Sequence, residues 1–120
     1  MESATILVID DQECVRMLLR LILEDAGYQV TEAMNGRHGL ELFRECPADL
    51  VITDIAMPEM NGLDLILELT KAFLDIKVIA MTGASSEELQ KAKLLGARQI
   101  FQKPFNTQAL LSAVQYELRH

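Results

Sequence analysis

Short runs of apolar residues alternate along this chain with longer stretches in which apolar residues recur every three or four positions. The short runs, bounded by polar residues, are typical of strands, and the longer stretches are typical of helices. We therefore predict strands at residues 5–9, 29–32, 50–53, 77–81 and 99–102. Strands that alternate with helices in this way favour an α/β fold built on a parallel sheet.

The composition of each run predicts where its strand lies in the sheet. The runs at 5–9, 50–53 and 77–81 are almost purely apolar, which is typical of central strands that helices cover on both faces. The runs at 29–32 and 99–102 contain polar side chains, among them Gln, Thr and Glu. We expect these two strands at the edges of the sheet.

Capping residues mark the ends of the intervening helices. Gly27 should follow the first helix as a left-handed cap, and Gly96 should end the fourth. Asn35 should begin the second helix, which stops before Pro47, and Asn106 can cap the fifth. Ser85-Ser86-Glu87-Glu88 has the pattern of a capping box that opens the fourth helix. The predicted apolar stripes are Val15, Leu18, Leu19 and Ile22 in the first helix, Leu63, Ile66, Leu67 and Thr70 in the third, and Leu110, Leu111, Val114 and Leu118 in the fifth.

The length of 120 residues suits one domain over residues 1–120, and no repeat or linker-like stretch marks an effector domain in this chain. The formal net charge of −7 argues against direct nucleic acid binding, because phosphate backbones are bound largely through Lys and Arg. Cys14 and Cys46 lie in apolar patterns and are interpreted as reduced packing residues. No apolar stretch is long enough for a signal peptide or membrane insertion, so a cytoplasmic location is expected.

Polar residues follow the predicted strands at their carboxyl ends. Asp10 and Asp11 follow the first strand, Asp54 the third, Thr82 the fourth and Lys103 the fifth. In open parallel sheets, ligands bind outside the carboxyl ends of the strands. The fold should therefore gather these residues into one cleft.

The residue types in this cleft suit phosphoryl transfer. Carboxylates about 4 Å apart repel one another by about 4 kcal/mol per pair at an effective dielectric of 20, so a cation must sit among them. An all-oxygen site favours Mg²⁺, and Lys103 adds a second positive charge. Asp54 would then be a nucleophile that forms an aspartyl phosphate, while Thr82 and Lys103 would stabilise the phosphoryl oxygens.

Each of these residues also has an ordinary structural interpretation. Asp10 or Asp11 alone could cap the following helix, and Asp54 could cap a turn before Pro58. Thr82 could simply end a strand, and Lys103 could be a solvated loop residue. The chemically complementary set at the strand ends is what favours function over structure.

In combination these residues resemble the receiver domain of two-component response regulators, from about Ile6 to the end of the chain. The resemblance rests on four blocks in order: Asp10-Asp11, Asp54-Ile55-Ala56-Met57-Pro58 with Asn61-Gly62, Met81-Thr82-Gly83, and Lys103-Pro104-Phe105. It implies a flavodoxin-like, doubly wound sheet in the order 2-1-3-4-5, flanked by five helices. It also implies a cis peptide bond before Pro104.

The resemblance further implies roles for the site residues. Asp54 would accept a phosphoryl group from a histidine kinase or a histidine phosphotransfer protein. Asp11, Asp54 and the backbone carbonyl of Ala56 would ligate Mg²⁺ directly, and Asp10 would act mostly through water. Lys103 would contact the phosphoryl group and Thr82 would turn toward it. The domain would be no enzyme beyond its own phosphorylation and dephosphorylation, and a downstream protein would contact its fourth helix, fifth strand and fifth helix.

One position departs from the family pattern. Receivers usually carry Tyr or Phe three residues before the lysine, as a switch that turns inward on phosphorylation, and this chain has Ile100 there. Phe101 should lie on the opposite face of the strand and should not replace that aromatic residue. We expect Thr82 to respond to phosphate and the signal to reach the fourth helix through packing of Ile100.

Three other functions remain as alternatives. A phosphate-independent interaction module with a receiver fold is the first, and Ile100 leaves it open. A haloacid-dehalogenase-like phosphatase would need an acid two residues after its nucleophile on the first strand, where this chain has Gln12 after Asp10. A flavodoxin-like flavin binder would need the acidic segment at residues 10–13 to bind phosphate, which its charge opposes.

Overall fold

The computed structural model describes residues 3–57, 60–83 and 86–119. Within these residues, five strands form one parallel sheet in the order β2-β1-β3-β4-β5. The strands are β1 (Thr5–Ile9), β2 (Gln29–Ala33), β3 (Leu50–Asp54), β4 (Val78–Thr82) and β5 (Gln99–Gln102). This confirms the predicted fold, the strand order and the two edge strands, with strand ends within one residue of those predicted.

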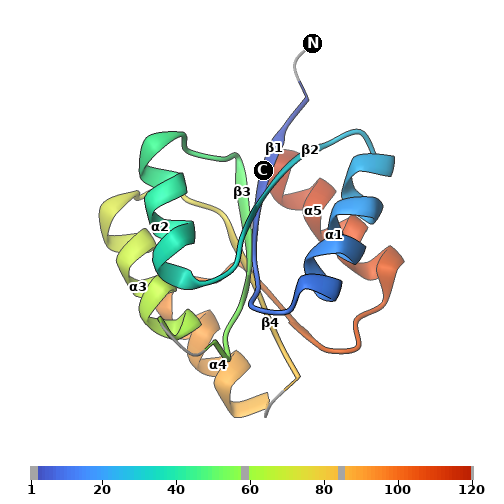
Figure 1. Ribbon diagram of the computed structural model, residues 1–120. Coiled ribbons are helices and arrows are strands. Elements are labelled where there is room, and N and C mark those ends of the chain that lie inside the picture. The colour runs from blue at the N-terminus through green and yellow to red at the C-terminus, as the bar shows by residue number, and fades with distance from the viewer. Residues whose placement is uncertain (1–2, 58–59, 84–85, 120) are drawn as a thin grey trace.

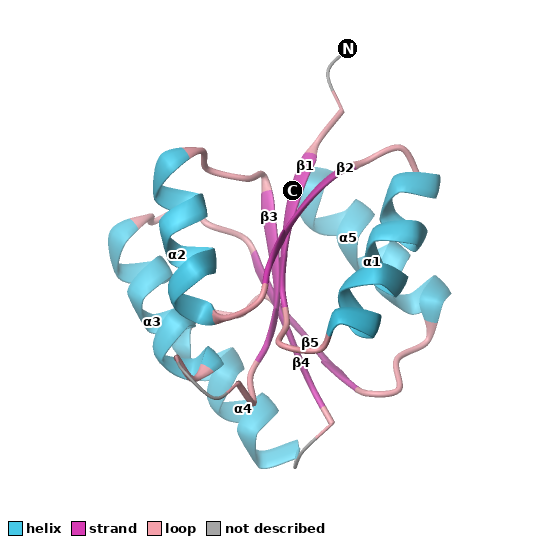
Figure 2. Cartoon of the chain, viewed as in Figure 1, coloured by secondary structure: helices cyan, strands magenta, loops and turns pink. Residues whose placement is uncertain are grey.

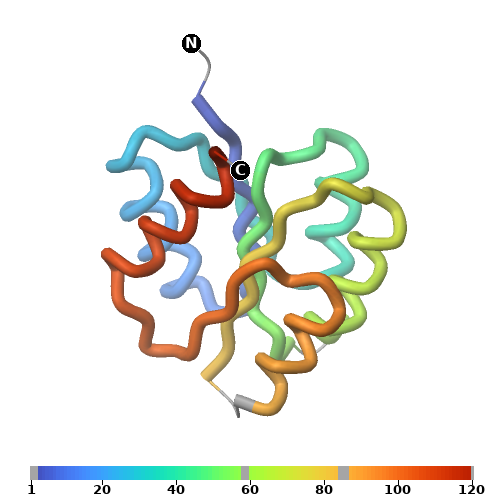
Figure 3. The backbone as a smooth tube through the Cα atoms, turned by 180° about the vertical axis from the view of Figure 1, so that it is seen from behind, coloured from blue at the N-terminus to red at the C-terminus, as the bar shows by residue number. Residues whose placement is uncertain are grey.

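Helices cover both faces of the sheet. They are α1 (Glu13–Asp25), α2 (Gly36–Glu45), α3 (Gly62–Ala72), α4 (Ser86–Leu95) and α5 (Thr107–Arg119). Helices α1 and α5 lie on one side, and α2, α3 and α4 lie on the other (Figures 1 and 2). Both termini lie at the end of the sheet away from the carboxyl ends of the strands (Figure 3). The loops that follow the strands are therefore gathered at the opposite end.

Alternation along the strands divides the core in two. Ile6 and Val8 of β1 pack with the α1 and α5 side chains, whereas Leu7 and Ile9 pack with the α2 and α3 side chains. Successive side chains of a strand point to opposite faces, and helices shield both faces here. The sheet is thereby a rigid support for the residues at its carboxyl edge.

The helix caps follow the sequence prediction where the structure describes them. The Asn35 side chain accepts a hydrogen bond from the His38 N–H at 2.8 Å, and the Asn106 side chain accepts one from the Ala109 N–H at 2.9 Å. Gly27 and Gly96 have positive φ values of 98° and 125°, in the region that favours glycine. The capping box predicted at Ser85 lies outside the described residues, as does Pro58.

The predicted helix stripes are partly wrong. Leu18 of α1 and Leu67 of α3 are 50% and 38% exposed. The side chains that α1 and α3 bury include Leu23, Leu65 and Leu69. Runs of adjacent leucines fit two neighbouring faces of a helix, so periodicity alone does not select the face that meets the sheet.

The interpretation of the cysteines as packing residues is also wrong. Cys14 and Cys46 are both free thiols, but both are exposed. Cys14 lies in the first turn of α1 and Cys46 is the C-cap of α2, and helix ends are more open to solvent than the apolar patterns around these residues suggest. In the described part of the chain, no helix is both long and apolar enough to cross a membrane.

Candidate functional site

The carboxyl ends of β1, β3, β4 and β5 meet at a cleft of about 280 Å³. Strand β3 ends on Asp54 and β4 ends on Thr82, while Asp10 and Lys103 directly follow β1 and β5. The lining residues are Asp11, Gln12, Asp54, Ala56, Thr82, Gly83 and Lys103. The residues that the sequence placed at separate strand ends therefore share one site.

Lys103 connects two of the carboxylates. Its Nζ lies 2.9 Å from Oδ2 of Asp10 and 3.2 Å from Oδ2 of Asp54. The Asp10 and Asp54 side chains are 1% and 7% exposed, and that of Lys103 is 17% exposed. Charges this buried are costly unless they are paired, so the ammonium group offsets part of the repulsion between the two acids.

Asp10 is held by its surroundings more completely than Asp11. Oδ1 of Asp10 accepts a hydrogen bond from the Gln12 N–H at 2.9 Å, and Oδ2 accepts one from Lys103. Asp11 is exposed and lines the open cleft. The adjacent acids therefore differ in character, one fixed inside the site and one presented at its entrance.

Burial and crowding act on the acidity of Asp54. Desolvation by burial and the negative charge of Asp10 together raise the pKa of Asp54, against the opposing effects of Lys103 and of a hydrogen bond from the Ala56 N–H. That N–H lies 3.2 Å from Oδ1 of Asp54. The ionised form of Asp54 is therefore less favourable here than in water, and a cation in the cleft would stabilise it.

For Lys103, the contacts with its charged partners outweigh the effect of burial on the pKa. Burial acts to lower the pKa of the Lys103 ammonium, but the hydrogen bond and charge of Asp10, together with those of Asp54, outweigh burial and raise it. Lys103 is therefore positively charged at neutral pH. A fixed cation of this kind is suited to stabilise phosphoryl oxygens.

Thr82 lies at the base of the cleft. Thr82 is fully buried, and its backbone carbonyl accepts a hydrogen bond from the Lys103 N–H at 2.9 Å. The peptide bond between Lys103 and Pro104 is cis, as the resemblance implied. Strands β4 and β5 thus place Thr82 and Lys103 side by side.

The oxygen-rich donor set fits a magnesium ion. Asp10, Asp11 and Asp54 each offer a carboxylate oxygen, and these oxygens lie within 4.8 Å of one another. Mg²⁺ prefers oxygen ligands and retains several waters, which an open cleft allows. Ala56 lines the same cleft next to Asp54, so its backbone is also close to this acidic cluster.

The loop after β3 is held close by Gly62. Its N–H donates a hydrogen bond to the Ile55 carbonyl at 2.8 Å. A Cβ added at Gly62 would lie 2.4 Å from the Asp54 carbonyl oxygen and 2.5 Å from Cα of Ile55. Only glycine allows α3 to begin this close to the strand that carries Asp54.

The ordinary interpretation of the first two acids is wrong. The N-cap of α1 is Gln12, and its side chain makes no capping hydrogen bond. Asp10 instead contacts Lys103 across the sheet. The turn interpretation of Asp54 is partly right, because its side chain does accept a hydrogen bond from the Ala56 N–H.

Ile100 and Phe101 point to opposite faces of β5, as predicted. Ile100 packs with the core cluster that contains Leu89 and Ala92 of α4. Phe101 packs with the cluster that contains Leu110 and Val114 of α5. The position between the fourth helix and the cleft is therefore occupied by an aliphatic side chain.

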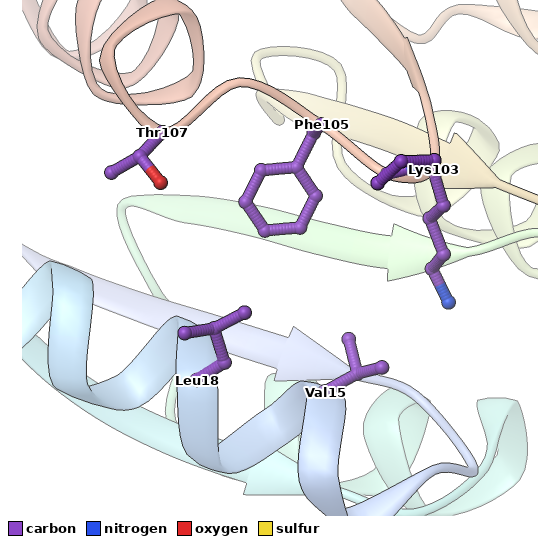
Figure 4. Close-up of a pocket in the computed structure, with 6 residues that line it drawn as sticks. Val15, Leu18, Lys103, Phe105 and Thr107 are labelled. Atoms are coloured by element: carbon purple, nitrogen blue, oxygen red, sulfur yellow. The ribbon is translucent and has the colours of Figure 1, made fainter.

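An apolar groove of about 360 Å³ adjoins the cleft and was not anticipated from the sequence. Val15 and Leu18 of α1 face Phe105 across this groove, with Lys103 at one end and Thr107 at the other (Figure 4). The outer surface of α1 also exposes Met17 and Leu21, which are 55% and 66% exposed. The sequence does contain a sign of this groove, because the apolar stripe of α1 is wider than the face that the sheet buries.

Comparisons with known proteins agree with this geometry. A family model described as the response regulator receiver domain matches residues 6–115. The chain is 37% identical to the chemotaxis protein CheY of Thermotoga maritima, over 91% of this chain and 92% of that protein. It is 34% identical to the sporulation initiation phosphotransferase F of Bacillus subtilis, over 96% and 94% of the two chains.

A solved structure shows the same arrangement of strands and helices. It is the response regulator protein TrrA from Thermotoga maritima in complex with Mg²⁺-BeF, with a TM-score of 0.88 and 34% identity. The similarity covers 95% of this chain and 98% of that one.

Proposed function

The chain belongs to the family of response regulator receiver domains, and from this premise we propose that it accepts a phosphoryl group on Asp54 from a histidine kinase or a histidine phosphotransfer protein. Receiver domains are signalling domains of two-component systems rather than conventional enzymes. The observation that carries the proposal is Asp54 itself, a nearly buried carboxylate at a strand end, paired with Lys103 and open to the cleft. The relative from Bacillus subtilis is a phosphotransferase by name, which is consistent with this chemistry.

In the proposed reaction, a carboxylate oxygen of Asp54 attacks the phosphorus of a phosphohistidine. The new O–P bond forms as the N–P bond breaks, and the electron pair of that bond returns to the donor imidazole. The domain supplies position and charge rather than a separate catalyst. Lys103 remains within reach of both Asp54 and the incoming oxygens, and Thr82 at the base of the cleft would donate its hydroxyl to one of them.

We assign the magnesium site to Asp10, Asp11, Asp54 and the backbone carbonyl of Ala56. When bound, Mg²⁺ would neutralise the charge of the carboxylates and of the transferred group. The chain itself holds one carboxylate oxygen of each of the three acids within 4.8 Å of the others. Burial and the nearby charge of Asp10 raise the pKa of Asp54. A bound cation would therefore favour the ionised form of Asp54, which is the nucleophile.

We propose that the phosphodonor binds at the apolar groove beside Lys103. This groove opens next to the cleft, and the neighbouring α1 surface exposes Met17, Leu18 and Leu21. Exposed apolar patches of this kind mark protein contacts more often than isolated apolar residues do. A downstream protein would bind the surface of α4, β5 and α5, where packing changes that begin at Thr82 would arrive.

The test is phosphorylation by a small acyl phosphate. The protein is incubated with acetyl phosphate and Mg²⁺, and its intact mass is measured. We expect wild type to gain one phosphoryl group and Asp54→Asn to gain none, while Asp64→Asn, which alters an exposed carboxylate in the first turn of α3, should behave as wild type. A wild type that gains no phosphoryl group, or an Asp54→Asn that gains as much, would contradict the proposal.

The main alternative is a receiver fold that binds its partner without phosphate. Ile100 at the usual aromatic position is the observation that favours it. The same mass measurement separates the two functions, because a phosphate-independent module would gain no phosphoryl group. A phosphatase, in contrast, would release phosphate from a phosphoester with many turnovers.

A further inference from the structure

The side chain of Arg16 in α1 contacts the acidic cluster at the backbone of Asp10 rather than at a carboxylate. Its Nη1 donates a hydrogen bond to the backbone carbonyl of Asp10 at 2.6 Å. The Arg16 side chain is only 13% exposed, although α1 faces solvent at many neighbouring positions. The guanidinium group is therefore committed to this contact rather than solvated.

Glu32 of β2 fixes the other side of the same guanidinium group. Nε of Arg16 lies 3.1 Å from Oε1 of Glu32, and Nε of Arg20 lies 2.6 Å from Oε2. The hydrogen bond from Arg20, with help from Arg16, lowers the pKa of Glu32, so Glu32 is ionised at neutral pH. Glu32 therefore holds two arginines of one helix with a single carboxylate.

The edge strand β2 thus holds the backbone of Asp10 from both sides. The Asp10 N–H donates to the Ala33 carbonyl at 3.1 Å, and the Asp10 carbonyl accepts from Arg16, which Glu32 fixes. These contacts set the direction in which β1 continues into the loop at residues 10–12. That loop carries Asp10 and Asp11, two of the three acids of the cluster.

From this geometry we infer that Arg16 is a positioning residue for the magnesium site, acting through the Asp10 carbonyl with Glu32 as its anchor. The inference rests on the proposed function of the site. Groups that orient metal ligands without touching the metal typically contribute about 10- to 100-fold to metal affinity. Among the described residues, Arg20 bonds to Glu32 and Glu24 but not to Asp10, so it provides a matched control on the same helix.

The test compares Arg16→Met with Arg20→Met. Mg²⁺ affinity is measured by NMR titration of the labelled protein, and the unfolding free energy of each variant is measured without Mg²⁺. We expect R16M to bind Mg²⁺ about tenfold more weakly than wild type and R20M to bind within about twofold. A merely structural role would destabilise both variants without this difference in affinity. A loss below about threefold in R16M, or an equal loss in R20M, would overturn the inference.

A second measurement requires no metal. The Gln12 N–H donates to Oδ1 of Asp10 at 2.9 Å, so its hydrogen exchange reports the order of this loop. Exchange at Gln12 should be faster in R16M than in R20M, and equal rates would count against the inference. If wild type binds no Mg²⁺, the proposed function of the site fails, whereas this comparison still tests the positioning.

Arg16→Lys replaces R16M if the latter does not fold. It keeps the charge and most of the aliphatic stem, but a single ammonium lacks the planar fork that reaches Asp10 and Glu32 together. We expect R16K to bind Mg²⁺ at least about threefold more weakly than wild type. A smaller loss would overturn the inference.

Discussion

At the scale of single residues, the site is a compromise between stability and function. Asp10 and Asp54 are almost fully buried and share one ammonium group. Desolvation by burial, with the charge of Asp10, raises the pKa of Asp54, so ionisation of Asp54 costs more in the folded protein than in the unfolded chain. The structure therefore holds a charge that it would be more stable without.

Asp54→Asn should consequently raise the melting temperature at pH 7 in the absence of divalent ions. Because the folded pKa of Asp54 is raised, wild type loses stability as the pH rises from the unfolded value of about 3.9 through the folded value, and the cost is fully present at neutral pH. The advantage of the variant should shrink as the pH falls toward about 4. Thermal unfolding across this pH range, with the exposed Asp75→Asn as control, would contradict this argument if D54N melted below wild type at pH 7.

Lys103→Met should have the opposite effect on stability. It leaves Asp10 and Asp54 buried without their ammonium partner, and charged hydrogen bonds of this kind typically contribute about 2 kcal/mol. The raised pKa of Lys103 means that its contribution is fully present at neutral pH and is lost only as the pH rises through the folded pKa. Urea unfolding at pH 7 should show this loss. Lys91→Met, which breaks an exposed pair with Glu88, should change stability by less than about 0.5 kcal/mol.

At the scale of elements, the junction of β3 and α3 decides where Asp54 and Ala56 lie. A Cβ at Gly62 would meet backbone atoms of Asp54 and Ile55 at 2.4 Å and 2.5 Å. Backbone atoms cannot give way as a flexible side chain can, so the loop itself must move.

We expect Gly62→Ala to lower the unfolding free energy by about 1–3 kcal/mol and to slow phosphorylation by acetyl phosphate. Gly83→Ala is a control for stability within the same cleft, because among the described residues the nearest atom to its added Cβ would be Cβ of Lys103, at 3.9 Å. Denaturant unfolding and mass spectrometry measure the two effects. Equal unfolding free energies of the two variants would show that the close approach at Gly62 does not require glycine.

Strand β5 connects the cleft to two different helices through its two faces. Ile100 packs toward α4 and Phe101 packs toward α5. The two residues are adjacent in sequence, so they allow the route of a signal to be assigned to one face.

Ile100→Val should weaken the response of α4 to beryllofluoride and Mg²⁺, measured as amide chemical-shift changes in residues 86–95. The substitution removes one methylene group, at a stability cost of about 0.5–1.5 kcal/mol. Phe101→Leu should leave the α4 response in place and alter shifts in α5 instead. An aromatic side chain that changes rotamer between Thr82 and α4, or an unchanged α4 response in I100V, would contradict this route.

At the scale of the whole molecule, the sequence predicted the sheet better than the helices. Strands buried on both faces leave unbroken apolar runs, so strand ends were placed within one residue, and the polar composition of residues 29–32 and 99–102 indicated the edges. The helix faces were harder, because Leu18 and Leu19 are equally apolar and only the packed structure shows that Leu19 is buried and Leu18 is exposed.

The sequence predicts which residues form the candidate site but not which of them contact one another. The topology brings strand ends together, so Asp10, Asp54, Thr82 and Lys103 could be grouped from their positions alone. That Asp10 is buried beside Lys103 while Asp11 faces the cleft depends on side-chain directions that periodicity does not contain. The contact of Arg16 with the Asp10 carbonyl was hidden for the same reason, since it joins α1 to a backbone atom.

The exposure of Asp11 permits a test that links the proposed magnesium site to the stability of the whole domain. A ligand that binds only the folded state stabilises it by RT ln(1 + [L]/Kd), which is about 1.4 kcal/mol at ten times the dissociation constant. For a domain of this size that free energy corresponds to a rise in melting temperature of about 5 °C. Because Asp11 is exposed, Asp11→Asn should leave the metal-free melting temperature nearly unchanged and yet lose most of the rise with Mg²⁺. NaCl at matched ionic strength controls for screening of the net charge of −7, and an undiminished Mg²⁺ response in D11N would place the ion away from the acidic cluster.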